Sequence, residues 1–204
     1  MDNGFFIAFE GPEGSGKSTQ IRRLAKSLEE VGRDFIVTKE PGGTPAGDAI
    51  REVLLDPTLR IDPLPEFLLY SASRAQHVEE VIQPALNAGK LVVSDRFAGA
   101  SVAYQGYGRG LDLSFIRELS ERVTNNIYPD LTLLLDMEPE RGLERVAKRG
   151  QKDRLEQADL SFHRKVRRGF LEQAKEDKSW VVLNAEQSEE VLAKEIWNAV
   201  SDVL

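Results

Sequence analysis

The sequence predicts an α/β protein in which a mostly parallel sheet is covered by helices on both faces. Five short apolar runs, typical of buried strands, alternate with longer stretches that carry apolar residues at helical spacing. These runs cover 5–9, 35–38, 91–94, 131–135 and 180–183. A glycine-rich segment, 11–18, joins the first run to the first helical stretch, which is the order of a strand, an anion-binding turn and a helix.

Two of the helical stretches have clear start and stop signals. The first covers 19–31 and stops at Gly32, which can adopt the left-handed conformation of a helix cap. The second is opened by Pro63 and Pro65 and closed by Gly89. We expect the apolar stripe of each helix to face the core. The two stripes consist of Ile21, Leu24, Ala25, Leu28 and Val31, and of Leu68, Leu69, Ala72, Ala75, Val78 and Ile82.

Length and charge narrow the class of protein. A chain of 204 residues suits one domain spanning 1–204. Its net charge of -7 argues against nucleic acid or an anionic membrane as a partner, because proteins that bind these carry a basic excess.

The chain has no cysteine, which excludes disulfides and thiolate chemistry. It shows neither a secretory signal pattern nor an apolar run approaching about 18 residues, so we expect a cytoplasmic protein.

Residues 11–18 read GPEGSGKS, a complete match to the phosphate-binding pattern G-x-x-x-x-G-K-[ST]. In such a loop the backbone N–H groups surround a triphosphate, and the glycines allow its close approach. Lys17 is placed to reach the β- and γ-phosphates, and the Ser18 hydroxyl is placed to ligate Mg²⁺. The residues predicted to bind ATP are Gly11, Pro12, Glu13, Gly14, Ser15, Gly16, Lys17, Ser18 and Thr19.

Two further loops follow predicted strands, at the edge where an open α/β sheet binds its ligands. Asp95 and Arg96 follow the third strand, where the carboxylate suits Mg²⁺ and the guanidinium suits a phosphate. Spacing alone is equally compatible with an ion pair at the end of the strand. The segment 40–44, EPGGT, follows the second strand and taken alone indicates only a fixed turn.

Basic residues gather between 141 and 168, where ten of the chain's 27 lysines and arginines occur in an otherwise acidic protein. Arg141, Arg145 and Arg149 recur at four-residue spacing, which places them on one face of a helix. We predict that the first part, about 141–156, forms a mobile lid with Gly150 as a hinge, which brings Arg145, Arg149 and Arg154 to a polyphosphate. For the last part, Arg164 to Arg168, a solvated basic face is the simpler interpretation.

Taken together, these motifs resemble those of the thymidylate kinases in their bacterial form. The resemblance covers almost the whole chain and rests on FEGPEGSGKST at 9–19, EPGG at 40–43, YSASR at 70–74, DRF at 95–97, SVAYQG at 101–106 and DR at 153–154. It implies the P-loop kinase fold, with a five-stranded parallel sheet flanked by helices on both faces and a lid segment. It also implies transfer of the γ-phosphate of ATP to dTMP, giving dTDP and ADP for dTTP synthesis, with Mg²⁺ and usually as a homodimer.

The resemblance further implies how dTMP is bound. Arg74 would contact the thymine edge and the acceptor phosphate, while Ser101 and Gln105 would face the hydrogen-bonding edge of the base. Glu13 would reach the sugar 3′-hydroxyl, and Tyr104 would crowd the 2′ position and so favour deoxyribose. The residues implied for dTMP are Glu40, Pro41, Arg51, Tyr70, Arg74, Arg96, Ser101, Tyr104 and Gln105.

Phosphoryl transfer needs positioning and neutralisation of charge more than covalent chemistry by the protein. The loop has no arginine, although another branch of the family carries one at the position of Gly14. We therefore expect a lid arginine, Arg149 or Arg145, to enter the site on closure. The predicted catalytic residues are Glu13, Lys17, Asp95, Arg96, Arg145 and Arg149, with Ser18 and Asp95 as metal ligands.

Two residues depart from the family pattern. Tyr70 stands where a phenylalanine more often stacks on thymine, so its added hydroxyl needs a partner or water. Phe97 stands where a tyrosine frequently follows Asp-Arg, which predicts the loss of a hydroxyl near the phosphates.

Three other functions share the phosphate-binding loop. A GTPase switch would need Asn-Lys-x-Asp and Asp-x-x-Gly, and neither occurs in the sequence. A kinase for another small acceptor, such as a deoxynucleoside or a different nucleoside monophosphate, is the second possibility. The combination of Arg74, Tyr104 and Gln105 distinguishes a thymidylate kinase from it. A non-catalytic nucleotide-binding module is disfavoured because Lys17 and the metal-binding pair are intact.

Overall fold

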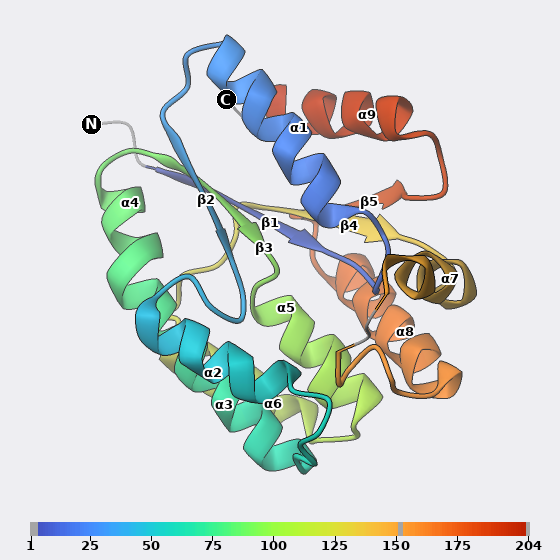
Figure 1. The fold of residues 1–204 in the computed structure, drawn as a ribbon. Coiled ribbons are helices and arrows are strands. Elements are labelled where there is room, and N and C mark those ends of the chain that lie inside the picture. Colours follow the sequence, from blue (N-terminus) through green and yellow to red (C-terminus); the bar gives the residue numbers. More distant parts are fainter. Residues whose placement is uncertain (1–3, 151–152, 203–204) are drawn as a thin grey trace.

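The structure, a computed structural model, describes residues 4–150 and 153–202, and describes Arg149 only as part of its helix. Its centre is a sheet of five parallel strands (Figure 1). The strands are β1 (Phe5–Glu10), β2 (Phe35–Lys39), β3 (Leu91–Asp95), β4 (Leu131–Asp136) and β5 (Trp180–Asn184), in the order β2-β3-β1-β4-β5 across the sheet. The predicted parallel sheet is confirmed, and each strand is one residue longer than predicted.

The strand register brings the functional loops to one edge of the sheet. Phe9 of β1 pairs with Asp95 of β3, and Asp95 pairs on its other side with Lys39 of β2. Because parallel strands all point the same way, the loops that follow β1, β2 and β3 leave the sheet at the same edge.

Helices cover both faces of the sheet, as predicted (Figure 1). On one face, α1 (Lys17–Glu30) and α9 (Glu189–Ser201) pack against Ile7 and Phe9. On the other face, Phe6 and Ala8 pack against the helical stretch around residue 80. The remaining helices are α2 (Pro45–Leu55), α3 (Pro63–His77), α4 (Gln83–Asn87), α5 (Ala98–Ser101), α6 (Leu113–Val123), α7 (Pro139–Arg149) and α8 (Leu160–Glu176), with π-helical segments η1 (Val78–Ile82) and η2 (Val102–Gly108).

The first predicted helix is correct in outline. Its stripe residues Ile21, Leu24 and Leu28 are buried against the sheet. Val31 is exposed instead, because α1 ends at Glu30 and the chain turns away there.

The second predicted helix is correct in extent but wrong in orientation over its first half. It runs from α3 through η1 into α4, and Val78 and Ile82 of η1 are buried as predicted. In α3, however, Leu68 is 46% exposed and Ala72 is also exposed. The buried side of α3 consists of Glu66, Phe67, Ser71, Ser73, Arg74 and His77. A mostly polar face is thus turned inward, which is stable only where its groups find partners.

Within 4–150 and 153–202, every helix is too short or too polar to cross a lipid bilayer.

Candidate functional site

The phosphate-binding loop lies between β1 and α1, and α7 packs directly against it. Gly14 has φ 72°, and a Cβ atom there would lie 2.2 Å from the carbonyl oxygen of Gly142 in α7. Glycine is therefore required by both the left-handed backbone and the contact with α7. An arginine does not fit at this position, so a cation for the transferring phosphate has to come from another element.

The Lys17 side chain is buried and folds back over the loop. Its ammonium group donates to the carbonyl oxygens of Gly11 and Pro12, both at 3.1 Å, and to Ser15 Oγ at 3.3 Å. Burial and the nearby charge of Arg96 lower the pKa of Lys17 to about 8. A bound phosphate would favour the protonated form.

Ser18 and Asp95, the two predicted metal ligands, lie within hydrogen-bonding distance of each other. Ser18 lies in the first turn of α1 and Asp95 is the last residue of β3. The Ser18 hydroxyl donates to Asp95 Oδ2 at 3.0 Å. Two oxygen donors beside a phosphate-binding loop fit Mg²⁺, which takes one or two protein oxygens and completes its coordination with phosphate oxygens and water.

Arg96 links the loop to the opposite side of the site. Its backbone has φ 76°, a left-handed conformation that costs about 1–3 kcal/mol in a non-glycine residue and is typical of binding sites. The guanidinium donates to the Gly11 carbonyl oxygen at 3.1 Å, to Glu13 Oε1 at 2.8 Å and to the Tyr104 hydroxyl at 2.9 Å. The tyrosine hydroxyl donates in turn to the same Glu13 oxygen at 2.6 Å. Three predicted site residues therefore form one network.

The charges in this network are well defined. Burial alone would raise the pKa of Glu13, but Arg96, Lys17 and the hydrogen bond from Tyr104 outweigh it and lower the pKa to about 2. Burial raises the pKa of Tyr104, so its hydroxyl stays protonated at neutral pH and can donate. Glu13 is thus an ionised acceptor held between a cation and a phenol.

Arg74 of α3 is 1% exposed and its guanidinium is fully engaged with neighbouring groups. Nε donates to Glu40 Oε2 at 2.7 Å, and the terminal nitrogens donate to Ser101 Oγ at 3.1 Å and to the Phe97 carbonyl oxygen at 3.2 Å. The other oxygen of Glu40 contacts His77 Nδ1 at 3.2 Å. Arg74, Glu40 and Ser101, all implied for dTMP binding, therefore lie together and fix one another's positions.

Gln105 of η2 is also buried, and its amide has a defined orientation. Its Nε2 donates to Glu66 Oε1 at 2.8 Å. Because a carboxylate can only accept, the amide has to present its NH₂ group to Glu66, which leaves its carbonyl oxygen for other contacts. Glu66 also accepts hydrogen bonds from Arg109 and Arg154.

Helix α7 carries two of the arginines predicted for the lid, Arg145 and Arg149, together with Arg141. The third lid arginine, Arg154, is instead largely buried against Glu66 and the Leu54 carbonyl oxygen. Arg145 lies over the phosphate-binding loop, where its guanidinium donates to the Gly14 carbonyl oxygen at 3.3 Å. Arg141 forms an ion pair with Glu186 instead. Arg149 ends α7. Its side chain, on which its predicted role depends, lies outside the described part of the chain, and so do residues 151–152.

These elements enclose a pocket of about 580 Å³, which is within the size range of small-molecule sites. The predicted catalytic residues that line it are Glu13, Lys17, Asp95, Arg96 and Arg145. Of the residues predicted for dTMP, the lining set is Glu40, Pro41, Arg51, Tyr70 and Arg96. The others, Arg74, Ser101, Tyr104 and Gln105, are buried, and Arg74 and Tyr104 hydrogen-bond to residues of the lining.

One prediction about this region is wrong, and another is correct only in part. The Phe97 ring packs edge-on against Phe6 with centroids 4.9 Å apart, so it belongs to the core and not to the phosphate site. The solvated basic face predicted for Arg164 to Arg168 is confirmed for Arg164, Lys165 and Arg168, which are exposed. Arg167 is different, because it is partly buried and donates to both carboxylate oxygens of Asp136, at 2.8 and 2.9 Å. This pair fastens α8 to the end of β4.

The sequence analysis missed several residues that hold the site together. Glu66 orients Gln105, while His77 contacts Glu40 and, through Nε2, the Thr38 hydroxyl at 2.6 Å. The sequence does contain a pattern that could have identified them, because polar residues recur at helical spacing along α3. This second stripe consists of Glu66, Tyr70, Ser73, Arg74 and His77.

The two sides of the pocket define a class of enzyme. A loop shaped for a triphosphate and Arg145 stand on one side, while Arg96 and a layer of oriented hydrogen-bonding groups stand on the other. This arrangement is that of a P-loop kinase for a small acceptor.

Comparisons with known proteins give the family. The family model for thymidylate kinase matches residues 9–196. The chain is 56% identical to a thymidylate kinase of Deinococcus radiodurans over 99% of this chain and 98% of that protein. It is 50% identical to a thymidylate kinase of Halothermothrix orenii, with 98% of each covered. The crystal structure of a thymidylate kinase from Ehrlichia chaffeensis matches with a TM-score of 0.79 at 32% identity, covering 97% of this chain and 99% of that one. The chain belongs to the thymidylate kinase family.

Proposed function

We propose that this protein transfers the γ-phosphate of ATP to dTMP, giving dTDP and ADP for dTTP synthesis. The observation that carries the proposal is one pocket lined both by the phosphate-binding loop and by Arg96 and Tyr70. The relatives called thymidylate kinase, similar over almost the full chain, support the choice of acceptor.

Transfer requires two anionic phosphates to approach in line, so cations between them matter more than a general base. Lys17 would hold the donor phosphates, and Arg96 would bind the acceptor phosphate. Mg²⁺, held by Ser18 and Asp95, would neutralise charge on the β- and γ-phosphate oxygens. The distance of 3.0 Å between the Ser18 hydroxyl and Asp95 Oδ2 supports this pair as ligands.

The acceptor sugar would lie beside Glu13 and Tyr104. Glu13 is ionised across the physiological pH range, so it can accept a hydrogen bond from the 3′-hydroxyl. Tyr104 is held against Arg96 and Glu13, which supports a fixed ring that would crowd a ribose 2′-hydroxyl. A smaller side chain at Tyr104 should therefore reduce discrimination against the ribonucleotide, and unchanged discrimination would contradict this role.

Base selection would depend on how the Gln105 amide is oriented. With its NH₂ group donated to Glu66, the amide carbonyl oxygen can accept the N3–H of thymine. Cytosine has a lone pair at N3, so the same oxygen would repel it. The substitution Glu66→Gln allows residue 66 to donate to Gln105, so the Gln105 amide is no longer held in one orientation. We therefore expect this variant to prefer dTMP over dCMP less strongly than the wild type. Selection against dUMP depends on a single methyl group, worth about 1–3 kcal/mol, so dUMP should be a poorer but measurable acceptor.

The transferring phosphate needs one more cation, and the contact between Gly14 and Gly142 means that the loop cannot supply it as an arginine. Arg145 is one candidate, because it already lies over the loop. Arg149 is the other candidate of the proposed lid. We expect Arg145→Ala or Arg149→Ala to reduce kcat by about 10³-fold or more, by analogy with other phosphate-contacting arginines. Lys148→Ala, on the same helix, is the matched control, and near-full kcat in both arginine variants would exclude the lid mechanism.

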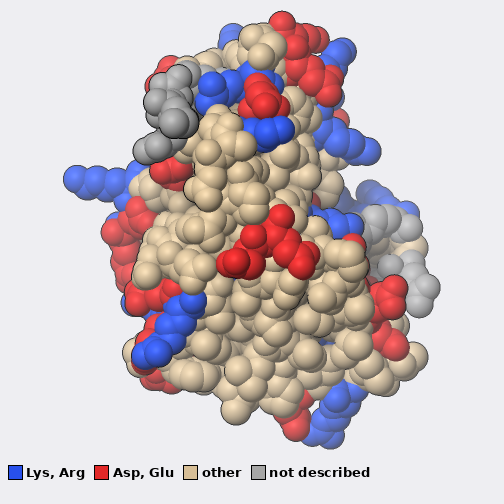
Figure 2. All heavy atoms as spheres, turned by 90° about the vertical axis from the view of Figure 1, so that its left-hand side faces the viewer, with Lys and Arg blue, Asp and Glu red and all other residues tan. Residues whose placement is uncertain are grey.

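We also propose that the protein is a homodimer. Apolar side chains from three packed helices, Val53 of α2, Leu64 and Leu68 of α3 and Phe115 of α6, are exposed. In Figure 2 the lower part of the molecular face, where α2 and α3 lie, carries few charged side chains. An uncharged apolar area of this kind is typical of a subunit interface.

Acceptor-dependent ADP release tests the proposed function. With ATP and Mg²⁺, dTMP should be the best acceptor in a panel that also contains dUMP, dCMP, the ribonucleotide TMP and thymidine. A higher kcat/KM for dCMP or thymidine would establish the other candidate, a kinase for a different acceptor. No acceptor-dependent ADP release would establish a nucleotide-binding module.

A further inference from the structure

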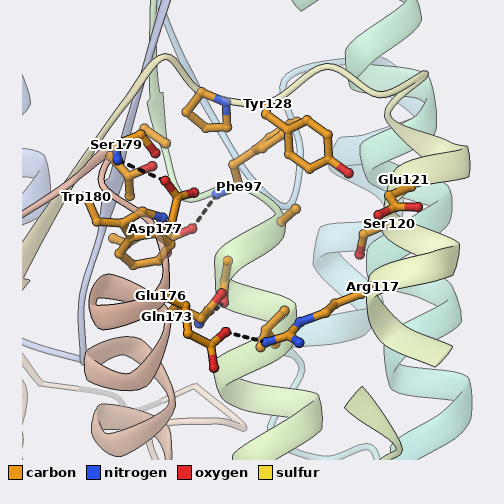
Figure 3. A pocket seen from close by; sticks show the side chains of 17 residues that line it. Phe97, Arg117, Ser120, Glu121, Tyr128, Gln173, Glu176, Asp177, Ser179 and Trp180 are labelled. Carbon is orange, nitrogen blue, oxygen red and sulfur yellow. Dashed lines mark hydrogen bonds and ion pairs between the residues drawn. The ribbon is translucent and has the colours of Figure 1, made fainter. Parts of the chain in front are cut away.

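A second cavity, of about 250 Å³, lies between α6, the end of α8 and the start of α5 (Figure 3). Its walls are mainly apolar and include Phe97, Val102, Tyr128, Pro129 and Trp180. No described residue lines both this cavity and the phosphate-binding pocket, so the two spaces are separate.

Two residues that line this cavity each carry a buried oxygen atom with no hydrogen-bond partner among the described residues. These atoms are Glu10 Oε2, at the end of β1, and Ser120 Oγ, on α6. The two residues are 1% and 4% exposed. A buried polar atom without a partner costs about 1–3 kcal/mol, more if it is charged, so these two oxygens favour a ligand that donates hydrogen bonds.

The charge of the lining favours a cation. Four acidic side chains face one basic side chain around the cavity, namely Glu10, Glu121, Glu176 and Asp177 against Arg117. Arg117 is already paired with Glu176 at 2.9 Å, as Figure 3 shows. Among the described residues Glu10 forms no such ion pair, and its Oε1 accepts hydrogen bonds from two backbone amides. Arg96, Lys17 and Arg74 nevertheless act on it electrostatically.

We propose that this cavity is a second binding site, which takes a small planar cation with N–H donors, such as an amidinium or a guanidinium. The aromatic walls would contact the flat part of the ligand, and its N–H groups would donate to Glu10 and Ser120. An apolar cavity of about 150 Å³ holds benzene, so this larger one has room for a substituted ring.

Glu10 would belong both to this second site and to the structure that supports the phosphate-binding pocket. Glu10 Oε1 accepts hydrogen bonds from the amides of Phe97 at 2.9 Å and Ala100 at 3.1 Å, both in the segment that follows Arg96. Burial raises the pKa of Glu10 to about 7, although Arg96 and the Phe97 amide oppose the shift. The other charged groups around Glu10 are Lys17 and Arg74, and, across the cavity, Arg117, Glu121, Glu176 and Asp177. A cation should therefore bind more tightly as the pH rises through about 7, because it requires the ionised carboxylate.

Benzamidine is a suitable probe, since it is a planar amidinium that keeps its charge from pH 6 to pH 8. Calorimetry on the full chain should show one binding site, with a Kd about tenfold lower at pH 8 than at pH 6. Benzyl alcohol, of similar shape but neutral, and benzoate, an anion, should bind at least tenfold more weakly. Glu10→Gln should weaken benzamidine binding at least tenfold and remove its pH dependence.

A second variant keeps the proposal falsifiable if Glu10→Gln fails to fold. Ser120→Leu on α6 should fill the cavity and abolish binding, whereas Ser120→Ala should preserve the space and lose only one hydrogen bond. The proposal is overturned if wild-type protein binds no benzamidine at millimolar concentration. It is also overturned if binding is unaffected by Ser120→Leu, or if the affinity is the same at pH 6 and pH 8.

Discussion

Helices α1 and α3 both carry an apolar stripe, and they use it in opposite ways. In α1 the stripe, which includes Leu24 and Leu28, is buried against the sheet. In α3 the apolar Leu68 is exposed, while Glu66 and Arg74 are buried. The difference lies in what each helix packs against. The inner face of α1 meets an apolar sheet, whereas the inner face of α3 meets side chains that can pair with its polar groups.

The comparison teaches that amphipathic periodicity identifies a helix but not the face that it buries. Burying Glu66 would be prohibitive in isolation, yet Arg109, Arg154 and Gln105 converge on it from other parts of the chain. Those partners make an inward polar face stable, and the same pairing fixes groups that the proposed reaction needs.

The largest expected effect comes from breaking the polar face of α3. Arg74→Met retains much of the side-chain volume but removes the guanidinium that pairs with Glu40, so a buried carboxylate loses its charged partner. We expect the free energy of unfolding to fall by about 3–5 kcal/mol. The kcat/KM for dTMP should fall by about 10²-fold or more. Urea denaturation and steady-state assays measure the two effects, and a variant close to wild type in both would show that Arg74 is a passive part of the core.

The matching change in α1 should separate stability from activity. Leu28→Ala creates a cavity against the sheet and should cost about 2–5 kcal/mol of unfolding free energy. Because Leu28 contacts no predicted substrate group, kcat measured well below the melting temperature should remain close to wild type. A large loss of kcat in fully folded protein would mean that α1 transmits strain to the loop.

Glu10 sharpens the comparison, because it is a buried acid whose Oε1 accepts hydrogen bonds from two backbone amides. Within the described part of the chain it forms no ion pair, whereas Glu40 pairs with Arg74. The pKa of Glu10 is raised by burial from 4.5 to about 7. The folded protein therefore binds more protons than the unfolded chain between these values, so stability falls as the pH rises through this window. The loss amounts to about 3 kcal/mol, and Glu10→Gln should remove it. Urea denaturation of both proteins at pH 5 and pH 8 measures the difference, and parallel pH profiles would contradict it.

The smallest effect on the fold is expected at the exposed leucine of α3. Leu68→Ser should change the stability of one subunit by no more than about 0.5 kcal/mol, in contrast to Leu28→Ala. It should nevertheless shift the proposed homodimer toward monomer, because it places a polar group in the apolar face. Sedimentation velocity over a range of concentrations measures this shift. A monomeric wild-type protein would remove the explanation for the exposed stripe.

Local patterns predicted much of the site. The loop 11–18 and the Asp95-Arg96 pair lie where expected, since a contiguous motif and the end of a strand are local properties of the chain. The buried pairing of Gln105 with Glu66 was not predictable, because those residues are far apart in sequence and the contact depends on how η2 crosses α3. Phe97 was misplaced for a related reason, since a motif identifies a position in the chain but not the direction of a side chain.

The sequence by itself determined the parallel α/β fold, the phosphate-binding loop and the membership of the family, because buried strands and glycine-rich turns leave a signature within a few residues. Only the tertiary structure decided which face of α3 is buried, that Arg145 lies over the phosphate-binding loop, and that Glu10 and Ser120 line a common cavity. These features depend on contacts between distant segments, and the free energy of burying a polar group is set by the partners that those contacts provide.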